Sequence, residues 1–268
     1  MKTAITDIRR PVGDLLREWR RHRRMSQLAL AAEAEVSTRH LSFVESGRAQ
    51  PSREMILRLC QYLDVPLRER KALLVAAGFA PAYREHGMDS PRFDAVRQTI
   101  DTLLRGFEPY PMLAVNRHWQ LLTANASAQR LMAGVPAELL QSPINVLRLS
   151  LHPTGLAPRI RNLAQWRDHL LERLRQQIAA CHDIALIELL RELEQLSCPV
   201  YGDVAVIASR NDLAVPLLLD VGDRVLSLWS TTTVFGTPMD ITLAELALEA
   251  FVPANEETAA YLRKWGSS

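Results

Sequence analysis

Two short segments of helical periodicity follow each other closely near the N-terminus, and a serine precedes each of them. Ser26 precedes residues 27–34 and Ser37 precedes residues 38–45, with Gly47 just beyond the second segment. Serine at such a place caps a helix by accepting a backbone N–H, and glycine ends a helix cheaply because it tolerates a left-handed backbone. Two helices with so short a connection must cross tightly, which constrains the fold of the whole N-terminal region.

Three more helices are predicted around this pair. Apolar residues recur at helical spacing over residues 12–24, 53–63 and 67–77, which makes five short helices and therefore a compact all-α module. Residues 81–91 are rich in proline, glycine and polar side chains and are typical of a linker, and a connecting helix is predicted over residues 93–104.

Positive charge is concentrated in the N-terminal module. Residues 1–80 contain fifteen Lys and Arg against nine Asp and Glu, whereas the rest of the chain contains seventeen against twenty-one. The net charge of +2 for the whole chain conceals this asymmetry. It is expected where one domain meets a polyanion and the other does not. The seven arginines between Arg9 and Arg24 alone would also fit a solvated helix face.

The second half of the chain mixes strand and helix patterns. Short apolar runs predict strands at residues 112–115, 120–123, 204–208, 214–219, 224–232 and 245–251, although periodicity does not exclude a helix at the last of these. Asn125 and Asn255 are placed to cap helices, and residues 144–196 have helical periodicity. The pattern predicts an α+β domain, an antiparallel sheet with a large helical insertion between its second and third strands.

These patterns divide the chain into three parts. An all-α domain over residues 1–80 is followed by a linker and connecting helix over residues 81–105, and the α+β domain occupies residues 106–268. Two domains agree with the length of 268 residues, which is long for one hydrophobic core.

Composition limits the environment and the class of protein. No apolar run reaches the roughly 18 residues of a membrane span, and the N-terminus lacks the apolar core of a secretion signal. We therefore expect a cytoplasmic protein without a membrane partner. Cys60, Cys181 and Cys198 are scattered and odd in number, which indicates neither a disulfide framework nor a zinc ribbon.

The segment over residues 27–48 is specific enough to compare with known families. With Leu30 and Ala31 in its first half, the segment resembles the helix-turn-helix of the Xre and phage-repressor family, over about residues 12–77. The resemblance implies that Leu30 and Ala31 pack the first motif helix on the next, where a small side chain at Ala31 lets the two cross closely. The resemblance implies a five-helix lambda-repressor-like domain that binds double-stranded DNA; an antitoxin-like or scaffolding use of the same helices is the alternative.

The resemblance also implies roles for individual side chains. Gln27 lies at a helix N-terminus, where it would bind a phosphate. Arg39 can read guanine and Phe43 can contact thymine methyl groups in the major groove. The side chains expected to contact DNA are Gln27, Ser37, Thr38, Arg39, His40, Phe43 and Arg48.

One implied pair is structural, and one position departs from the family pattern. Arg20 is expected to form a partly buried ion pair with Glu45. The family commonly has glycine in the turn between the two motif helices, and here Glu35 stands at that position. A non-glycine residue in a left-handed turn costs on the order of 1 kcal/mol, which a small domain tolerates.

Several separated stretches of the second half match another known pattern. They are residues 108–115, Trp119, 123–125, 145–153, 161–162 with Trp166, and 230–240, completed by Glu245, Glu249, Phe251, Pro253 and Thr258. In this order they resemble the ligand-binding domain of MmyB-like regulators, a PAS-related fold attached to this type of helix-turn-helix. The resemblance implies a pocket between sheet and helices, and a sensor of a small molecule.

The apolar content of the covering helices suggests a hydrophobic or amphipathic effector, fatty-acyl in kind, with no cofactor required. Polar or aromatic residues among these apolar neighbours are candidates to contact the effector, namely Asn125, His152, Asn162 and Trp166. Each also has a structural interpretation: a helix cap, a helix end, a turn and a core residue, respectively.

Other functions have less support in the sequence. It contains no GxSxG, P-loop, dinucleotide-binding or HExxH motif, so we do not expect an enzyme. A metal or haem site through His152, His169, His182 or Cys181 is an alternative. The main alternative is a helix-turn-helix protein whose C-terminal domain only dimerises or recruits a partner. We expect a homodimer, because one recognition helix reads too few base pairs for useful specificity.

Overall fold

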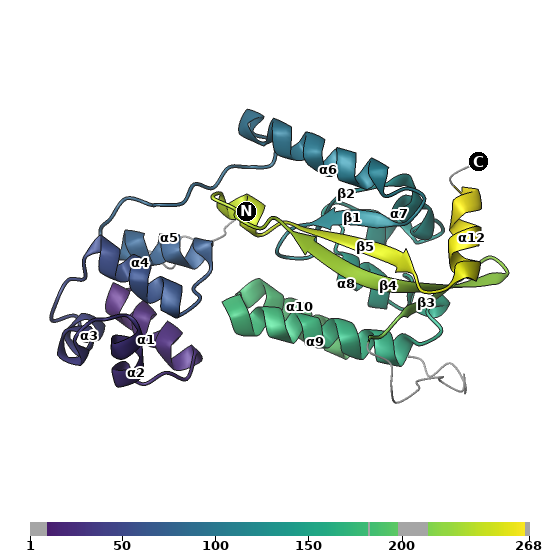
Figure 1. Cartoon of the computed structure of the whole chain (residues 1–268). Coiled ribbons are helices and arrows are strands. Elements are labelled where there is room, and N and C mark those ends of the chain that lie inside the picture. The colour runs from purple at the N-terminus through teal and green to yellow at the C-terminus, as the bar shows by residue number, and fades with distance from the viewer. Residues whose placement is uncertain (1–9, 182, 198–213, 266–268) are drawn as a thin grey trace. The chain divides into compact units, whose positions relative to one another are not determined.

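The computed structural model describes residues 10–181, 183–197 and 214–265 (Figure 1). The chain divides into two compact units between Glu85 and His86, with residues 239–241 assigned to the first. The strand predicted at 204–208, together with Cys198 and His182, lies outside the described residues. Within the described part, none of the helices combines the length and hydrophobicity that a membrane crossing requires.

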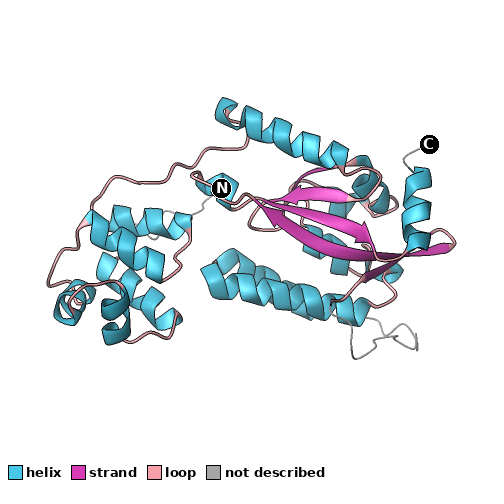
Figure 2. Cartoon of the chain, viewed as in Figure 1, coloured by secondary structure: helices cyan, strands magenta, loops and turns pink. Residues whose placement is uncertain are grey.

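The five predicted helices of the first unit are all present (Figure 2). They are α1 (Val12–His22), α2 (Gln27–Glu33), α3 (Thr38–Glu45), α4 (Arg53–Tyr62) and α5 (Leu67–Ala76). Ser26, Ser37 and Ser52 each accept a backbone N–H with the side-chain oxygen, at the start of α2, α3 and α4. The helices therefore begin where the sequence offers a cap.

One leucine-rich core holds these helices together. Its fully buried members include Leu16, Leu30, Leu41, Ile56, Leu59, Leu63 and Leu74. Glu35 has a φ of 52°, so the left-handed turn predicted between α2 and α3 is formed without glycine. Gly13 sets the approach of α1 to α3, because a Cβ at this position would lie 2.2 Å from the carbonyl oxygen of Val44.

The second unit is built on a five-stranded antiparallel sheet. Its strands are β1 (Met112–Val115), β2 (Leu121–Ala124), β3 (Leu217–Val221), β4 (Arg224–Val234) and β5 (Ala247–Pro253), in the order β2-β1-β5-β4-β3. The ambiguous segment near residue 247 is thus a strand, and it lies in the middle of the sheet. The first and last strands in the sequence are therefore neighbours.

Helices cover both faces of this sheet (Figure 1). On one face lies α6 (Asp94–Gly106), which packs Ile100 and Leu104 on Met112 and Ala114 of β1. The other face is covered by the helical insertion between β2 and β3. It consists of α7 (Ala126–Leu131), η2 (Ala137–Leu140), α8 (Val146–Leu151), η3 (Ala157–Arg159), α9 (Leu163–Cys181) and α10 (Ile184–Gln195).

Short elements complete the unit: η1 (Pro91–Phe93), α11 (Ile241–Ala244), of which Ile241 is assigned to the first unit, and the closing helix α12 (Glu256–Trp265). The helix predicted as a connector is α6, and its buried residues show that it also forms one layer of this unit. Burial on both faces explains why all four residues of β1 are apolar and buried.

Candidate functional site

The outer face of α3 carries the side chains predicted to read DNA. Arg39 and His40 are exposed, and Thr38 and Phe43 are half-buried. The Arg39 guanidinium carbon lies 5.4 Å from the ring centroid of Phe43. This contact holds the planar Arg39 guanidinium, a hydrogen-bond donor, over the apolar ring of Phe43 at the surface of α3.

Two other predicted contacts are engaged within the unit. The Ser37 hydroxyl oxygen accepts the backbone N–H of His40 at 3.1 Å, as a helix cap does. Gln27 Nε2 donates to Glu45 Oε2 at 2.9 Å, so its amide is held near the N-terminus of α2 and keeps further hydrogen-bonding capacity. Arg48, the last of the predicted set, is exposed just after α3.

The side chain of Glu45 holds α3 against α1 and α2. Arg20 donates to both carboxylate oxygens, from Nε at 2.6 Å and from its second terminal nitrogen at 2.8 Å. The predicted ion pair is confirmed. Burial raises the pKa of Glu45, but hydrogen bonds from Arg20 and Gln27 and the charges of Arg20 and Arg17 outweigh it, so the net pKa is lowered. Glu45 therefore stays ionised at neutral pH.

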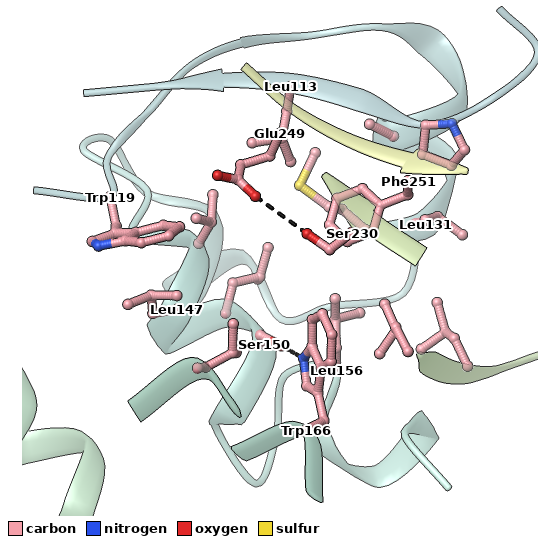
Figure 3. A pocket seen from close by; sticks show the side chains of 18 of the residues that line it. Leu113, Trp119, Leu131, Leu147, Ser150, Leu156, Trp166, Ser230, Glu249 and Phe251 are labelled. Carbon is pink, nitrogen blue, oxygen red and sulfur yellow. Dashed lines mark hydrogen bonds between the residues drawn. The ribbon is translucent and has the colours of Figure 1, made fainter. Parts of the chain in front are cut away.

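The second unit contains an apolar cavity of about 80 Å³ between the sheet and the helical insertion, partly open to solvent (Figure 3). Leu113, Leu217, Leu219 and Phe251 form its wall on the side of the sheet, and leucines of α8 and α9 face them. The remaining lining residues are Pro111, Trp119, Ala128, Leu131, Met132, Val146, Leu147, Leu149, Ser150, Leu156, Trp166, Leu170, Arg173, Ser230 and Glu249.

A compact polar cluster forms one part of this wall. Glu249 lies on the central strand β5 with only 4% of its surface exposed. Its Oε1 accepts from Arg173 at 2.9 Å and from Thr232 Oγ1 at 2.8 Å. Its Oε2 accepts from Arg173 at 3.2 Å and from Ser230 Oγ at 3.3 Å. The carboxylate is therefore neutralised by one guanidinium and hydrogen-bonded to two hydroxyls.

Trp119 joins this cluster to the turn after β1. Its backbone has a φ of 61°, which is uncommon for a bulky residue. The indole Nε1 donates to Gln177 Oε1 at 2.8 Å, and the Arg173 guanidinium carbon lies 4.9 Å from the ring centroid. Both partners lie on α9, so the left-handed turn aims the ring at that helix.

Of the four predicted ligand contacts, Trp166 lines the cavity and the other three do not. The Trp166 indole N–H donates to Ser150 Oγ at 3.0 Å (Figure 3). Asn125 instead accepts the backbone N–H groups of Met112 and Ala128 and donates to two carbonyls, which uses its whole amide for the fold.

Asn162 and His152 also have structural roles. Asn162 accepts the N–H of Leu218 at 3.1 Å and donates to the carbonyl of Pro216 at 2.8 Å, which ties the start of α9 to β3. His152 ends α8, with Nδ1 at 2.9 Å from Thr154 Oγ1. A polar residue among apolar neighbours in the sequence is therefore not enough to predict a cavity residue, because Asn125 and Asn162 have this pattern and use their amides to hold the fold together.

Ser150, Arg173 and Ser230 are not among the ligand contacts predicted from the sequence, and Glu249 and Trp119 are named there only as parts of the second resemblance. A buried acid on a central strand is a detectable signal, since Glu249 follows Leu248 in an apolar run. Its arginine partner is 76 residues away in the sequence, which no local pattern reveals. Among the described residues, no group of three or more His, Cys, Asp or Glu is placed to hold a metal ion.

Comparison with known proteins agrees with both halves of this architecture. A family described as the MmyB-like transcription regulator ligand binding domain matches residues 96–264, and a helix-turn-helix domain family matches residues 11–73. The transcriptional regulator ClgR of two Mycobacterium tuberculosis strains is 34% identical over 95 residues, which is 35% of this chain and 82% of that protein.

The crystal structure of the clp gene regulator ClgR from Corynebacterium glutamicum is 25% identical and covers 38% of this chain and 95% of that one. Its TM-score of 0.23 is too low to support a comparison of folds. The match to the ligand-binding family extends over more than half of the sequence. The chain therefore belongs to the MmyB-like transcription regulators, with a DNA-binding helix-turn-helix ahead of the MmyB-like domain.

Proposed function

We propose that this regulator binds a small apolar or amphipathic molecule, fatty-acyl in kind, in its second unit and that the bound molecule controls sequence-specific DNA binding by the first. The observation that carries the proposal is the cavity of about 80 Å³ between the sheet and the insertion, walled by apolar side chains with one polar cluster. A few convergent polar groups in an apolar pocket are typical of small-molecule sites. The PAS relationship of this unit is part of the same proposal.

The cavity is smaller than the roughly 300 Å³ at the lower end of ligand pockets. A ligand with a longer chain would need side chains to move aside, and Met132 on the wall has the flexibility to do so. Full-length protein purified without refolding should release a small molecule on denaturing extraction, identified by mass spectrometry. If nothing is extracted and no apolar compound changes the melting temperature, the second unit serves only dimerisation or partner binding.

For the DNA-binding unit, we propose that Thr38, Arg39 and Phe43 contact base edges in the major groove. Ser37, His40 and Arg48 would contact the groove margin and backbone, and Gln27 would contact a phosphate. The exposure of Arg39 and its contact with Phe43 support this assignment.

Selection from a random duplex library by wild type and by Arg39→Ala tests the base-reading role. The variant should lose preference at one base position in each half-site and about 1–3 kcal/mol of specific binding. Arg92→Ala, which removes an exposed arginine of the second unit, is the matched control and should select the wild-type sequence. An unchanged preference in Arg39→Ala would refute the role.

We further propose that the protein acts on DNA as a homodimer. Two recognition helices would then lie in successive major grooves about 34–36 Å apart. Sedimentation of the complex on the selected duplex should give two chains, and the selected sequence should be a palindrome. A single chain on an asymmetric site would contradict the dimer.

A further inference from the structure

The polar groups of the cavity limit the charge of a ligand. Arg173 and Glu249 are the only ionisable residues among those that line it. They contact each other through both carboxylate oxygens, at 2.9 and 3.2 Å, and so cancel in charge. The Arg173 guanidinium also lies over Trp119, which further restricts its reorientation. Among the described residues, therefore, no unpaired cation lines the apolar space.

His169 is a nearby group that could have supplied a positive charge. Its ring is tilted by 31° against that of Trp166, with the centroids 5.4 Å apart. Burial lowers the pKa of His169, and the charge of Arg173 lowers it further, against a smaller opposite effect of Glu249. His169 is therefore neutral at pH 7 and provides no compensation for a buried anion.

A carboxylate bound next to Ser230 in this cavity would lie in apolar surroundings beside Glu249. Burying a charge without a partner is far more costly than burying a hydroxyl or an amide that finds hydrogen bonds. The neighbouring Glu249 adds repulsion between like charges. An uncharged head group avoids both costs.

The cavity also offers hydrogen bonds that suit an uncharged head group (Figure 3). Ser150 Oγ accepts the indole N–H of Trp166 at 3.0 Å, which leaves its own hydrogen to be donated. Ser230 donates to Glu249 over a long 3.3 Å and retains lone pairs that can accept. Ser150 thus offers a donor and Ser230 an acceptor, the two kinds of group that bond the carbonyl and the N–H of an amide, or a hydroxyl.

We propose that the cavity selects an uncharged amphipathic ligand, an aliphatic chain that ends in an amide or a hydroxyl, and rejects the free carboxylate of the same length. The Arg173–Glu249 pair is the specificity determinant, because Glu249 neutralises the guanidinium that a carboxylate would otherwise use. This inference rests on the proposed function, since it assigns a ligand class to the same cavity.

The test compares hexanamide with hexanoate, and octanamide with octanoate, on the full chain at pH 7.5. Calorimetric titration should show the amide binding at least about tenfold more tightly than the carboxylate of equal length. Equal or tighter binding of the carboxylate overturns the inference but leaves ligand binding in place. Binding of none of the four compounds, nor of the corresponding alcohols, counts against the proposed function as well.

Glu249→Gln tests the determinant directly. It leaves Arg173 without a counter-charge, so the preference should fall at least tenfold or reverse in favour of the carboxylate. Glu172→Gln is the matched control, because it removes the same charge from an exposed residue of α9 and should keep the wild-type preference. If Glu249→Gln folds and retains the wild-type ratio, the pair is not the determinant.

Ser150→Ala provides a second variant that keeps the ion pair intact. It should weaken hexanamide binding several-fold by removing the donor from the wall. If Glu249→Gln fails to fold, two results decide the proposal. They are the ratio of amide to carboxylate affinity measured on the wild type and the loss of hexanamide affinity in Ser150→Ala. Unchanged hexanamide binding in Ser150→Ala would contradict the assigned head-group contact.

Discussion

Glu45 is a residue of α3 whose side chain faces the protein. The residue is 2% exposed, and its carboxylate accepts hydrogen bonds from Arg20 and Gln27. Removing one partner of a buried pair is costly because the other charge is left uncompensated. Arg20 has the complementary shift: the hydrogen bond to Glu45 raises its pKa despite the opposing effect of burial.

Glu45→Gln should therefore destabilise the first unit by about 3 kcal/mol. Hydrogen exchange of the α3 amides in the full chain measures the loss locally. Glu18→Gln removes an acid from the exposed Arg10 pair and should change the stability by less than about 1 kcal/mol. Equal effects of the two substitutions would show that burial of the Arg20 pair is unimportant.

Asp183 is a half-buried acid whose pKa is lowered to about 2. Burial raises this pKa, but the hydrogen bond from His118 and the charge of Arg117 lower it by more. Asp183 Oδ2 lies 2.6 Å from Arg117 and 2.9 Å from His118, and Oδ1 caps α10. The residue thus ties the turn after β1 to the helical insertion.

Because the folded pKa of Asp183 is depressed, its contribution to stability is present above the unfolded pKa of about 3.9 and is lost as the pH falls toward 2. Asp183→Asn keeps a capping oxygen and should remove about 2 kcal/mol at pH 7. Urea unfolding of both proteins between pH 7 and 2 should show the gap closing in this window. A gap that stays constant with pH would exclude the charge as its cause.

At the scale of elements, the crossing of α1 over α3 depends on the absence of a side chain at Gly13. The space for a Cβ there is occupied by backbone, the carbonyl of Val44 at 2.2 Å, which no side-chain rotation can clear. The same crossing brings Arg17 and Arg20 of α1 to Glu45. Gly13 thus permits both the packing and the ion pair.

Gly13→Ala should force α1 away from α3 and cost about 1–3 kcal/mol, the range of overpacking. Gly87→Ala is a suitable control, since its Cβ would meet no atom within 4 Å and its φ is not in the left-handed region. Chemical denaturation followed by far-UV circular dichroism compares the two. If Gly13→Ala leaves the free energy of unfolding unchanged, α1 and α3 can move apart without a cost in free energy.

At the scale of the whole molecule, the two units have separate hydrophobic cores. One core is formed by α1 to α5, whereas the sheet and its covering helices form the others. Among the described residues, none belongs to the cores of both units. We therefore expect a core substitution in one unit to leave the core of the other unchanged.

We expect two thermal transitions in the full chain. Glu45→Gln should lower one of them, and hexanamide at about 100 times its dissociation constant should stabilise the other by about 2.7 kcal/mol. Differential scanning calorimetry of wild type and variant, with and without hexanamide, separates the effects. A single transition that responds to both changes would mean that the units unfold as one.

Local patterns in the sequence were enough to predict the described elements and most of their order. Serine caps located the starts of α2, α3 and α4, and apolar runs located the sheet strands in the described part, with ends shifted by up to three residues. These signals are local. A capping side chain accepts a backbone N–H within its own helical turn, and the burial of a strand is visible in the apolar residues of the strand itself. The resemblance to regulator families could be recognised for the same reason, because the motifs that carry it are short stretches of sequence.

The tertiary structure alone decided which polar side chains face the cavity. Asn125 and Asn162 look like site residues in the sequence, yet their amides are consumed by backbone groups brought from other elements. Arg173 and Glu249 meet only because α9 folds over the central strand β5. Contacts between distant segments follow from packing and not from local pattern, so the charge balance of the cavity, and with it the ligand class, could be inferred only from the fold.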